Sequence, residues 1–432
     1  MSGQISETPV LTELSERLLQ PVNGRDLHRA RWHLLDWVGC AVAGSKEPAG
    51  IILRQTSTAD GSGTAFVWGG LGNILEMDDV DKRALLHPGP SIVPAALAMA
   101  ETRETGLPDV LAAIVRGYEA TIRLGRAVGP AHYALWHSTG TCGAIGAAVA
   151  SAHLLELDTA ETAHAMALAV SQAAGLWHTR HDAESMGKQL HTAAAARAGL
   201  DAAQLAQLGF HGPRAILEGE QGFFQAMCPD GNPNQVLSHQ TDWMIHDVSF
   251  KPWPACRHAH AVIDAALELR DQIAVAQVDR ITVRTYSDAL KFCDRPSPQT
   301  VIEAKFSLQH SVATTLLHGA PELTDFSAEA IQDPDVSALR EKVHVEIGQR
   351  YEDQYPARFG AEVSVDGTTS LVEDALGDPE NPVSEDQIRQ KAHKLMMAGG
   401  MTQDATEKLS DMVMSGEAGI DRLMTQLREG LA

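Results

Sequence analysis

The sequence predicts a mainly α protein in which a large all-helical domain, formed from both chain ends, carries a smaller inserted α+β domain. Three observations support this fold class. Apolar residues recur at helical spacing up to about residue 245, strand-like alternation follows, and helical spacing returns after residue 384. We therefore expect a helical domain over 1–249 and 384–432, and an α+β domain over 250–383.

Four stretches of the first part have a clear helical period, at 25–44, 91–104, 107–128 and 188–210. The last stretch is so rich in alanine that we expect close packing against another helix. In the inserted domain, three segments alternate as strands do, at 278–286, 343–347 and 361–367, and the third ends in an Asp-Gly turn. Between the first two strands, residues 300–319 are expected to form one helix.

The formal net charge of the 432 residues is −22, which argues against nucleic acid or an anionic membrane as the main partner. We expect no transmembrane helix, because no run of about 18 uncharged apolar residues occurs. The N-terminal segment is acidic and lacks an apolar signal core, so we expect a cytoplasmic protein. The five cysteines are scattered, which predicts neither a disulfide framework nor a metal site built from thiolates.

The segment LEMDDVDKRALLHPG, at 75–89, gathers charged residues directly before a histidine. These residues are Glu76, Asp78, Asp79, Asp81, Lys82, Arg83 and His87. One interpretation is a solvated turn whose histidine caps the next helix. The other is a wall of an active site, and the local sequence leaves both open.

Two further segments combine histidine with a helix start. His137 precedes a Ser/Thr/Gly loop and a helix of small residues, where free backbone N–H groups suit a carboxylate; an ordinary capped helix is the alternative. Lys188 and His191 are three residues apart and share a helical face. Lys188 extends to solvent, neutralises a substrate carboxylate, or acts as a base with a lowered pKa.

The inserted domain begins with a basic segment, KPWPACRHAHAVIDAA at 251–266. Its Cys256, His258 and His260 fit no common zinc spacing, and a polar helix start at the surface is the more ordinary interpretation. Arg257 could bind a carboxylate through two hydrogen bonds. His310, on the helix expected at 300–319, is by itself more typical of a core histidine than of a catalyst.

Taken together, these blocks resemble the MmgE/PrpD family over essentially the whole chain. The segments that carry the resemblance include NILEMDDVDKRALLHPGPSIVPAALAMAE, HSTGTCGAIGAAVASAHLLELD, GKQLHTAAAARAGLDAAQLAQLGFHGPRAILEGEQGF, KPWPACRHAHAVIDAA and AKFSLQHSVATTLLHG. The family includes 2-methylcitrate dehydratase, cis-aconitate decarboxylase and iminodisuccinate epimerase. The resemblance implies that the inserted domain is a lid, that the active site lies between the two domains, that no cofactor is needed, and usually a homodimer.

These reactions move a proton or carbon dioxide next to a carboxylate, so they need cations to hold the substrate and a base such as histidine. Carried over by position, the family's functional residues correspond to His87, His137 and Lys188. The chain departs from the dehydratases and decarboxylases at three positions: it has Glu76 for aspartate, Val80 for threonine and His310 for tyrosine. A histidine at 310 could supply a second base, which suits an epimerase.

We therefore expect a cofactor-independent proton-transfer enzyme that acts on a small di- or tricarboxylate and needs no metal. Dehydration is slightly favoured; epimerisation of an iminodisuccinate-like acid, decarboxylation and carboxylate binding without catalysis are the alternatives. The expected residues fall into two groups. The catalytic candidates are His87, His137, Lys188 and His310. The substrate-binding candidates are Asp78, Asp79, Lys82, Arg83, Arg257 and His258.

Overall fold

The computed structural model describes residues 8–56, 59–103, 105–182, 184–416 and 419–431. The chain divides into two compact units. Unit 1 comprises Met1–Ile74, Asp78–Val248 and Glu385–Ala432, and unit 2 comprises Leu75–Met77 and Ser249–Ser384. Helices dominate, and the described residues form one four-stranded sheet, so the predicted mainly α class is confirmed.

In its described part, unit 1 consists of helices. The α-helices are α1 (Val10–Arg17), α2 (Gly24–Gly44), α3 (Pro48–Leu53), α4 (Gly61–Leu71), α5 (Gly89–Arg103), α6 (Leu107–Ala127), α7 (Pro130–Leu135), α8 (Ser138–Leu154), α9 (Thr159–Val170), α10 (Gly187–Gln207), α11 (Phe223–Met227), α19 (Glu385–Ala398), α20 (Gln403–Ser415) and α21 (Ile420–Leu431). Short 3₁₀ turns are η1 (Trp177–His181), η2 (Pro233–Leu237) and η3 (Met244–Asp247).

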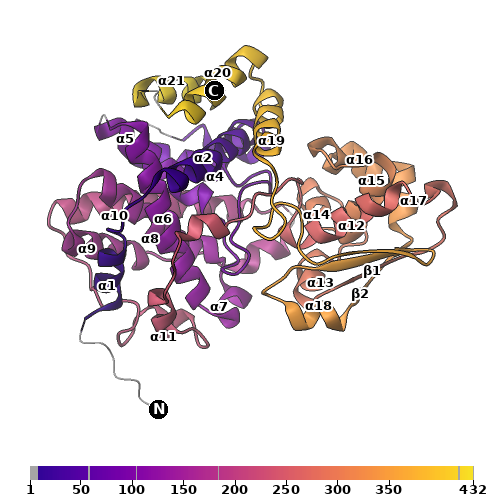
Figure 1. Cartoon of the computed structure of the whole chain (residues 1–432), viewed down its shortest axis with the longest axis horizontal. Helices are drawn as coiled ribbons and strands as arrows, with labels where there is room; N and C mark the ends of the chain where they lie inside the picture. The colour runs from indigo at the N-terminus through magenta and orange to yellow at the C-terminus, as the bar shows by residue number, and fades with distance from the viewer. Residues whose placement is uncertain (1–7, 57–58, 104, 183, 417–418, 432) are drawn as a thin grey trace. The chain divides into compact units, whose positions relative to one another are not determined.

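Helix α8 lies at the centre of unit 1, where it packs against α5, α6, α9 and α10 (Figure 1). Small residues allow this close approach. A Cβ atom added at Gly199 of α10 would lie 2.4 Å from the carbonyl oxygen of Ala144 on α8, a distance that no side chain tolerates. The close packing predicted from the alanine-rich stretch is therefore confirmed.

The C-terminal helices pack on the N-terminal helices of the same unit. Helix α19 lies along α2 (Figure 1), and a Cβ atom at Gly39 would lie 2.9 Å from the Cα atom of Ala392. The Nζ atom of Lys391 lies 2.6 Å from a carboxylate oxygen of Asp36, and both side chains are buried. Both chain ends therefore contribute to one helical core.

Unit 2 contains the sheet, whose strand order is β2-β1-β3-β4. The strands are β1 (Ile281–Thr285), β2 (Val343–Ile347), β3 (Ala361–Val365) and β4 (Thr368–Val372). The α-helices are α12 (His260–Arg270), α13 (Ser287–Cys293), α14 (Val301–Lys305), α15 (Leu308–His318), α16 (Ala328–Gln332), α17 (Pro334–Arg340) and α18 (Gln349–Gln354). The 3₁₀ turns are η4 (Arg257–Ala259), η5 (Val275–Gln277) and η6 (Leu323–Phe326). Helices α12 and α15 pack against the sheet.

The three predicted strands are confirmed, and the sequence missed β4. Strand β1 pairs in parallel with β2 and antiparallel with β3, and Asp366 and Gly367 join β3 to β4. Both turn residues have positive φ, 48° and 94°, as a two-residue hairpin turn requires. The Asp-Gly turn was thus predicted correctly, but the return strand is mostly polar and lacks a clear alternation.

Two helix predictions were wrong in detail. Residues 300–319 form two helices, because the chain breaks at Phe306 and the hydroxyl of Ser307 caps α15 by accepting a hydrogen bond from the N–H of His310. Residues 208–247 hold only short helical pieces. Several Pro and Gly residues in that segment stop the helical period from continuing.

Candidate active site

The acidic segment 75–89 is a buried loop that precedes α5. Asp78, Asp79 and Asp81 are at most 3% exposed. The loop is closed by a bridge in which the N–H of Asp81 donates to the carbonyl of Leu86 over 2.9 Å. These carboxylates are buried, and buried carboxylates require local partners. The interpretation of this segment as a solvated turn is therefore wrong.

His87 is held at one ring nitrogen. Its Nδ1 atom lies 2.9 Å from a carboxylate oxygen of Asp78 and 3.0 Å from the carbonyl oxygen of Asp79. Asp78 also accepts a hydrogen bond from the amide of Asn73 over 2.7 Å. Because a carbonyl oxygen can only accept, the proton of the neutral ring is on Nδ1, and Nε2 is the basic atom.

Asp79 supports the loop from behind. Its Oδ2 atom accepts from the Tyr118 hydroxyl over 2.6 Å and lies 2.6 Å from Nδ1 of His33, while its Oδ1 atom accepts from the N–H of Gly89 over 3.0 Å. Burial raises the pKa of Asp79 to about 6, although the bonds from Tyr118 and Gly89 oppose this. A Cβ atom at position 89 would lie 2.7 Å from Oδ1 of Asp79, so this contact requires glycine.

His137 lies at the start of α8 and is only 1% exposed. Its Nδ1 atom lies 3.2 Å from Nδ1 of His191 on α10. Its Nε2 atom has no hydrogen-bond partner in the part of the chain that the structure describes. Burial, followed by the charge of Lys188, lowers the pKa of both histidines, and that of His137 well below its usual range, so both rings are neutral near pH 7.

The structure brings three predicted residues, His87, His137 and Lys188, into one corner of unit 1. The backbone N–H of His87 donates to the hydroxyl of Thr139, in the first turn of α8, over 2.9 Å. Helices α5, α8 and α10 begin at Gly89, Ser138 and Gly187, each within two residues of one of the three predicted residues, and a helix N-terminus carries partial positive charge. With Lys188, they make the corner suited to an anion.

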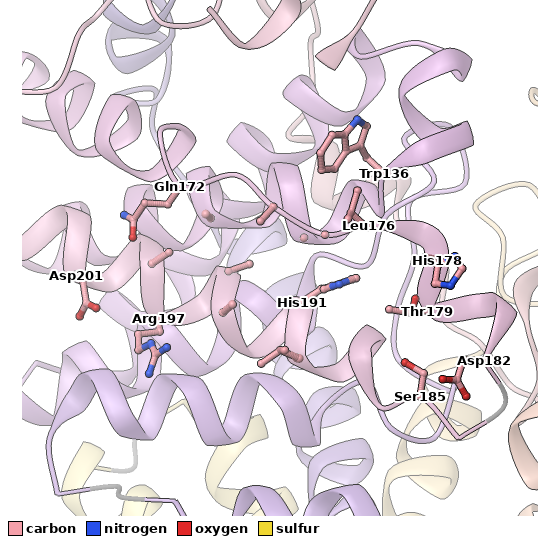
Figure 2. A pocket seen from close by; sticks show the side chains of 18 residues that line it. Trp136, Gln172, Leu176, His178, Thr179, Asp182, Ser185, His191, Arg197 and Asp201 are labelled. Carbon is pink, nitrogen blue, oxygen red and sulfur yellow. The ribbon is translucent and has the colours of Figure 1, made fainter. Parts of the chain in front are cut away.

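His191 was noted as a neighbour of Lys188 but was not among the residues expected to act. It also lines a pocket of about 640 Å³ in unit 1, between α8, α10 and the η1 segment. Figure 2 shows its ring near the middle of the lining residues, with Arg197 on one side and Thr179 on the other. The signal that could have identified it was the three-residue spacing from Lys188.

The other two predicted cations of the loop differ in exposure. Arg83 is exposed, and its guanidinium lies 3.3 Å from a carboxylate oxygen of Asp247. Lys82 is 1% exposed. Arg83 therefore balances a nearby acid, and the substrate-binding roles of both residues stay predictions.

In unit 2, the basic segment 251–266 is buried, so the expected surface helix start is wrong. Lys251, Cys256, Arg257, His258 and His260 are at most 7% exposed. Such burial needs paired charges. Arg257 forms an ion pair with Asp378, which also accepts a hydrogen bond from the Ser249 hydroxyl over 2.6 Å.

His258 packs as a core residue of unit 2. Its Nδ1 atom lies 2.7 Å from the Tyr286 hydroxyl, and its ring stacks on Phe292 and Phe359. Burial, followed by the charge of Arg257, lowers the pKa of His258 to about 3. The ring is therefore neutral near pH 7 and offers no charge to a carboxylate; its substrate-binding role stays a prediction.

His310 is also enclosed. It is 0% exposed, its Nε2 atom lies 2.8 Å from the carbonyl oxygen of Asp325, and its Nδ1 atom lies 3.3 Å from the guanidinium of Arg340. Burial lowers its pKa to about 4. Both ring nitrogens are engaged inside unit 2, as in a structural histidine, and its catalytic role stays a prediction.

Two buried lysines of unit 2 were not among the expected site residues. The Nζ atom of Lys251 lies 3.7 Å from a carboxylate oxygen of Glu76, and that of Lys305 donates to the carbonyl of Leu75 over 3.1 Å. Both partners belong to the three-residue part of the acidic segment that groups with unit 2. A lysine within an otherwise apolar stretch was the available signal.

One group of acids in the described chain has the spacing of a metal site: Asp374, Asp378 and Glu380. Arg257 pairs with Asp378, and Arg358 lies 3.4 Å from Asp374, so guanidinium groups already balance these charges. In the described residues, no helix is both long and apolar enough to cross a membrane.

Fold and geometry together define a mainly helical protein with a candidate site built around buried histidines. Comparison with family models agrees. The MmgE/PrpD N-terminal domain model matches residues 19–236, and the MmgE/PrpD C-terminal domain model matches residues 253–415. The chain belongs to the MmgE/PrpD family.

Several curated relatives are similar to this chain at low identity. The cis-aconitate decarboxylase-like protein oryM of Aspergillus oryzae is 28% identical, with 91% of each chain covered. The cis-aconitate decarboxylase of Mus musculus is 28% identical over 76% of this chain and 70% of its own. The 2-methylcitrate dehydratase of Salmonella typhimurium is 27% identical, over 33% of this chain and 30% of its own.

Proposed function

We propose that this protein is a cofactor-independent proton-transfer lyase that acts next to a carboxylate of a small di- or tricarboxylic acid. One observation carries the proposal. His87 presents a basic Nε2 atom, since Asp78 and the carbonyl of Asp79 hold its Nδ1–H, and it is anchored to the first turn of the helix that His137 begins.

The roles follow from the chemistry of each group. Removing a proton next to a carboxylate, or losing carbon dioxide from it, leaves negative charge on carbon that must be stabilised. Lys188 and the helix N-termini bind the carboxylates and spread this charge. His87, through its Nε2 atom, and His137 can take up or return the proton.

Among lyase reactions, decarboxylation gains support relative to the dehydration that the sequence slightly favoured. The relatives matched over about nine tenths of this chain, such as oryM and the Aspergillus terreus protein at 92% coverage, are named as decarboxylases or decarboxylase-like. Named dehydratases match over 33% to 47% of it. Epimerisation loses support, because the second base proposed for it, His310, has both ring nitrogens engaged.

The test is proton NMR in heavy water with citrate, 2-methylcitrate, cis-aconitate, iminodisuccinate, tartrate and malate. A vinyl signal that appears or disappears supports a lyase, and the product separates decarboxylation from dehydration. Inversion or deuterium exchange without an alkene would replace the lyase by an epimerase. Binding without turnover or exchange would favour a non-catalytic carboxylate-binding protein.

The variant His87→Asn ties the activity to the site. Asparagine keeps a donor near Asp78 but has no basic nitrogen, so kcat is expected to fall by about 10²- to 10⁴-fold. The melting temperature should change little, because the His87 side chain is at the edge of the core, 12% exposed. Equal losses of activity and stability would contradict the catalytic role.

The homodimer implied by the resemblance also belongs to this proposal. Several large apolar side chains of unit 1 are exposed. Their exposed fractions are 52% to 83%, and they are Leu135, Leu176, Leu190, Leu208 and Phe210. Large apolar side chains that gather in one exposed patch are typical of surfaces that become buried on association. Analytical ultracentrifugation should give a dimer, and the charged variant Leu208→Asp should shift it toward monomer.

A further inference from the structure

The 640 Å³ pocket of unit 1 has no role in the proposed chemistry so far. It is lined by backbone and small residues of α8 and α10, together with polar side chains such as Gln172, Thr179, Ser185 and Arg197 (Figure 2). Its polar groups and its size suit water. One histidine connects this pocket to the candidate active site.

That histidine is His191. It lines the pocket, and its Nδ1 atom lies 3.2 Å from Nδ1 of His137. His137 is 1% exposed and packs against Trp177, with ring centroids 4.5 Å apart. A base so enclosed needs a partner to exchange protons with water.

The two rings must hold complementary tautomers. A hydrogen bond between two Nδ1 atoms needs one proton, so one ring donates and the other accepts. If His137 donates, its Nε2 is the basic atom on the far side of the ring, and His191 carries its own proton on Nε2. Burial, followed by the charge of Lys188, lowers the pKa of both rings, so both are neutral and able to exchange roles.

We propose that His191 is a proton relay that connects His137 to water in the pocket. This inference rests on the proposed function. When His137 takes a proton at Nε2 from the substrate, its Nδ1–H passes to Nδ1 of His191, and the Nε2–H of His191 passes to water. Each ring gains one proton and loses one, so both end neutral with their tautomers exchanged. A passage in the opposite direction, or rotation of both rings, restores the starting tautomers.

The direction of the relay depends on the reaction. Decarboxylation leaves a carbanion that takes up one proton from solvent, so the proton travels inward from the pocket through His191. Dehydration removes a proton from carbon and adds one to the leaving hydroxide, so a proton travels outward and one then returns inward. The relay therefore matters for either lyase, and loss of His191 should slow turnover more than it weakens substrate binding.

The test uses His191→Ala and His191→Gln in the full-length protein. Both should lower kcat by about 10²-fold with little change in KM. Imidazole should restore activity to His191→Ala, because the pocket gives it access, whereas 1-methylimidazole, which has one free nitrogen, should not. The matched control is His211→Ala, a histidine outside the pocket lining. Wild-type kcat in both His191 variants, or equal rescue by the two imidazoles, would overturn the relay.

A second measurement needs no turnover and so separates this inference from the proposed function. In protein labelled with ¹⁵N-histidine, NMR can follow exchange of the His137 ring proton with water. Exchange should be slower by about tenfold or more in His191→Gln than in wild type or His211→Ala. Unchanged exchange would overturn the relay even if the lyase activity is found, and slower exchange would support it even if every acid of the panel is inert.

Discussion

His310 offers a quantitative test of whether a histidine of the site blocks is structural. The perturbation is His310→Gln, whose amide nitrogen can still donate to the carbonyl of Asp325, as Nε2 of His310 does. Glutamine cannot take up a proton in this pH range. The variant therefore removes the titration and keeps one of the two contacts.

The magnitude follows from the lowered pKa. Burial lowers the pKa of His310 from 6.5 to about 4, so the unfolded chain binds a proton between these values and the folded chain does not. Stability is therefore complete above pH 6.5 and is lost as the pH falls toward 4. Between these two pKa values, each pH unit lowers the free energy of unfolding by about 1.4 kcal/mol. His310 therefore lowers it by about 2 kcal/mol between pH 6.5 and pH 5.

The assay is urea unfolding at pH 8, 7, 6 and 5, followed by ¹⁹F NMR of 5-fluorotryptophan. Trp253 is the sole tryptophan of unit 2, so its resonance reports on the unit that contains His310. At pH 8 the variant is expected to have a lower free energy of unfolding than wild type, because only the lost packing counts there. The difference between the two free energies of unfolding should narrow by about 2 kcal/mol by pH 5, because only the wild type loses stability through His310. A difference in free energy of unfolding that stays constant with pH, together with a 10²-fold loss of kcat at pH 7, would refute the structural role.

Two further variants test the support of the site. Tyr118→Phe removes one donor from the buried carboxylate of Asp79; we expect a loss of about 1–3 kcal/mol in urea unfolding at pH 8, and unchanged stability would show that the carboxylate finds another donor. Gly199→Ala forces a Cβ atom to within 2.4 Å of the carbonyl oxygen of Ala144; we expect a loss of about 1–3 kcal/mol, whereas the control Gly24→Ala, with nothing within 4 Å, should change little.

The parts of the fold that follow from local periodicity could be predicted from sequence. The long helices α2, α5, α6 and α10 and the strands β1 to β3 have clear periods, and all were predicted. Strand β4 was missed, because its residues Thr368–Val372 are mostly polar and are held by pairing with β3. The break before α15 was missed because it depends on a single cap by Ser307.

The candidate site shows a similar limit. His87, His137 and Lys188 were predicted from their order in family blocks, and the structure brings them together in unit 1. Burial could not be predicted where charged residues find partners far along the chain. Arg257 can be buried because it pairs with Asp378, which lies 121 residues further along the sequence. No local sequence pattern indicates such a pair.

The same pairing explains why a net charge of −22 is compatible with the proposed site for an acid. Three buried acids near the candidate site each have a partner within unit 1 that carries positive charge or donates a hydrogen bond. Asp36 pairs with Lys391, Asp79 accepts from Tyr118, and Asp78 holds His87. The charges of these carboxylates are therefore balanced by local partners, and Lys188 and the nearby helix N-termini add positive potential to the proposed site. Net charge describes the whole surface, while affinity for an anion is decided by the few groups that face it.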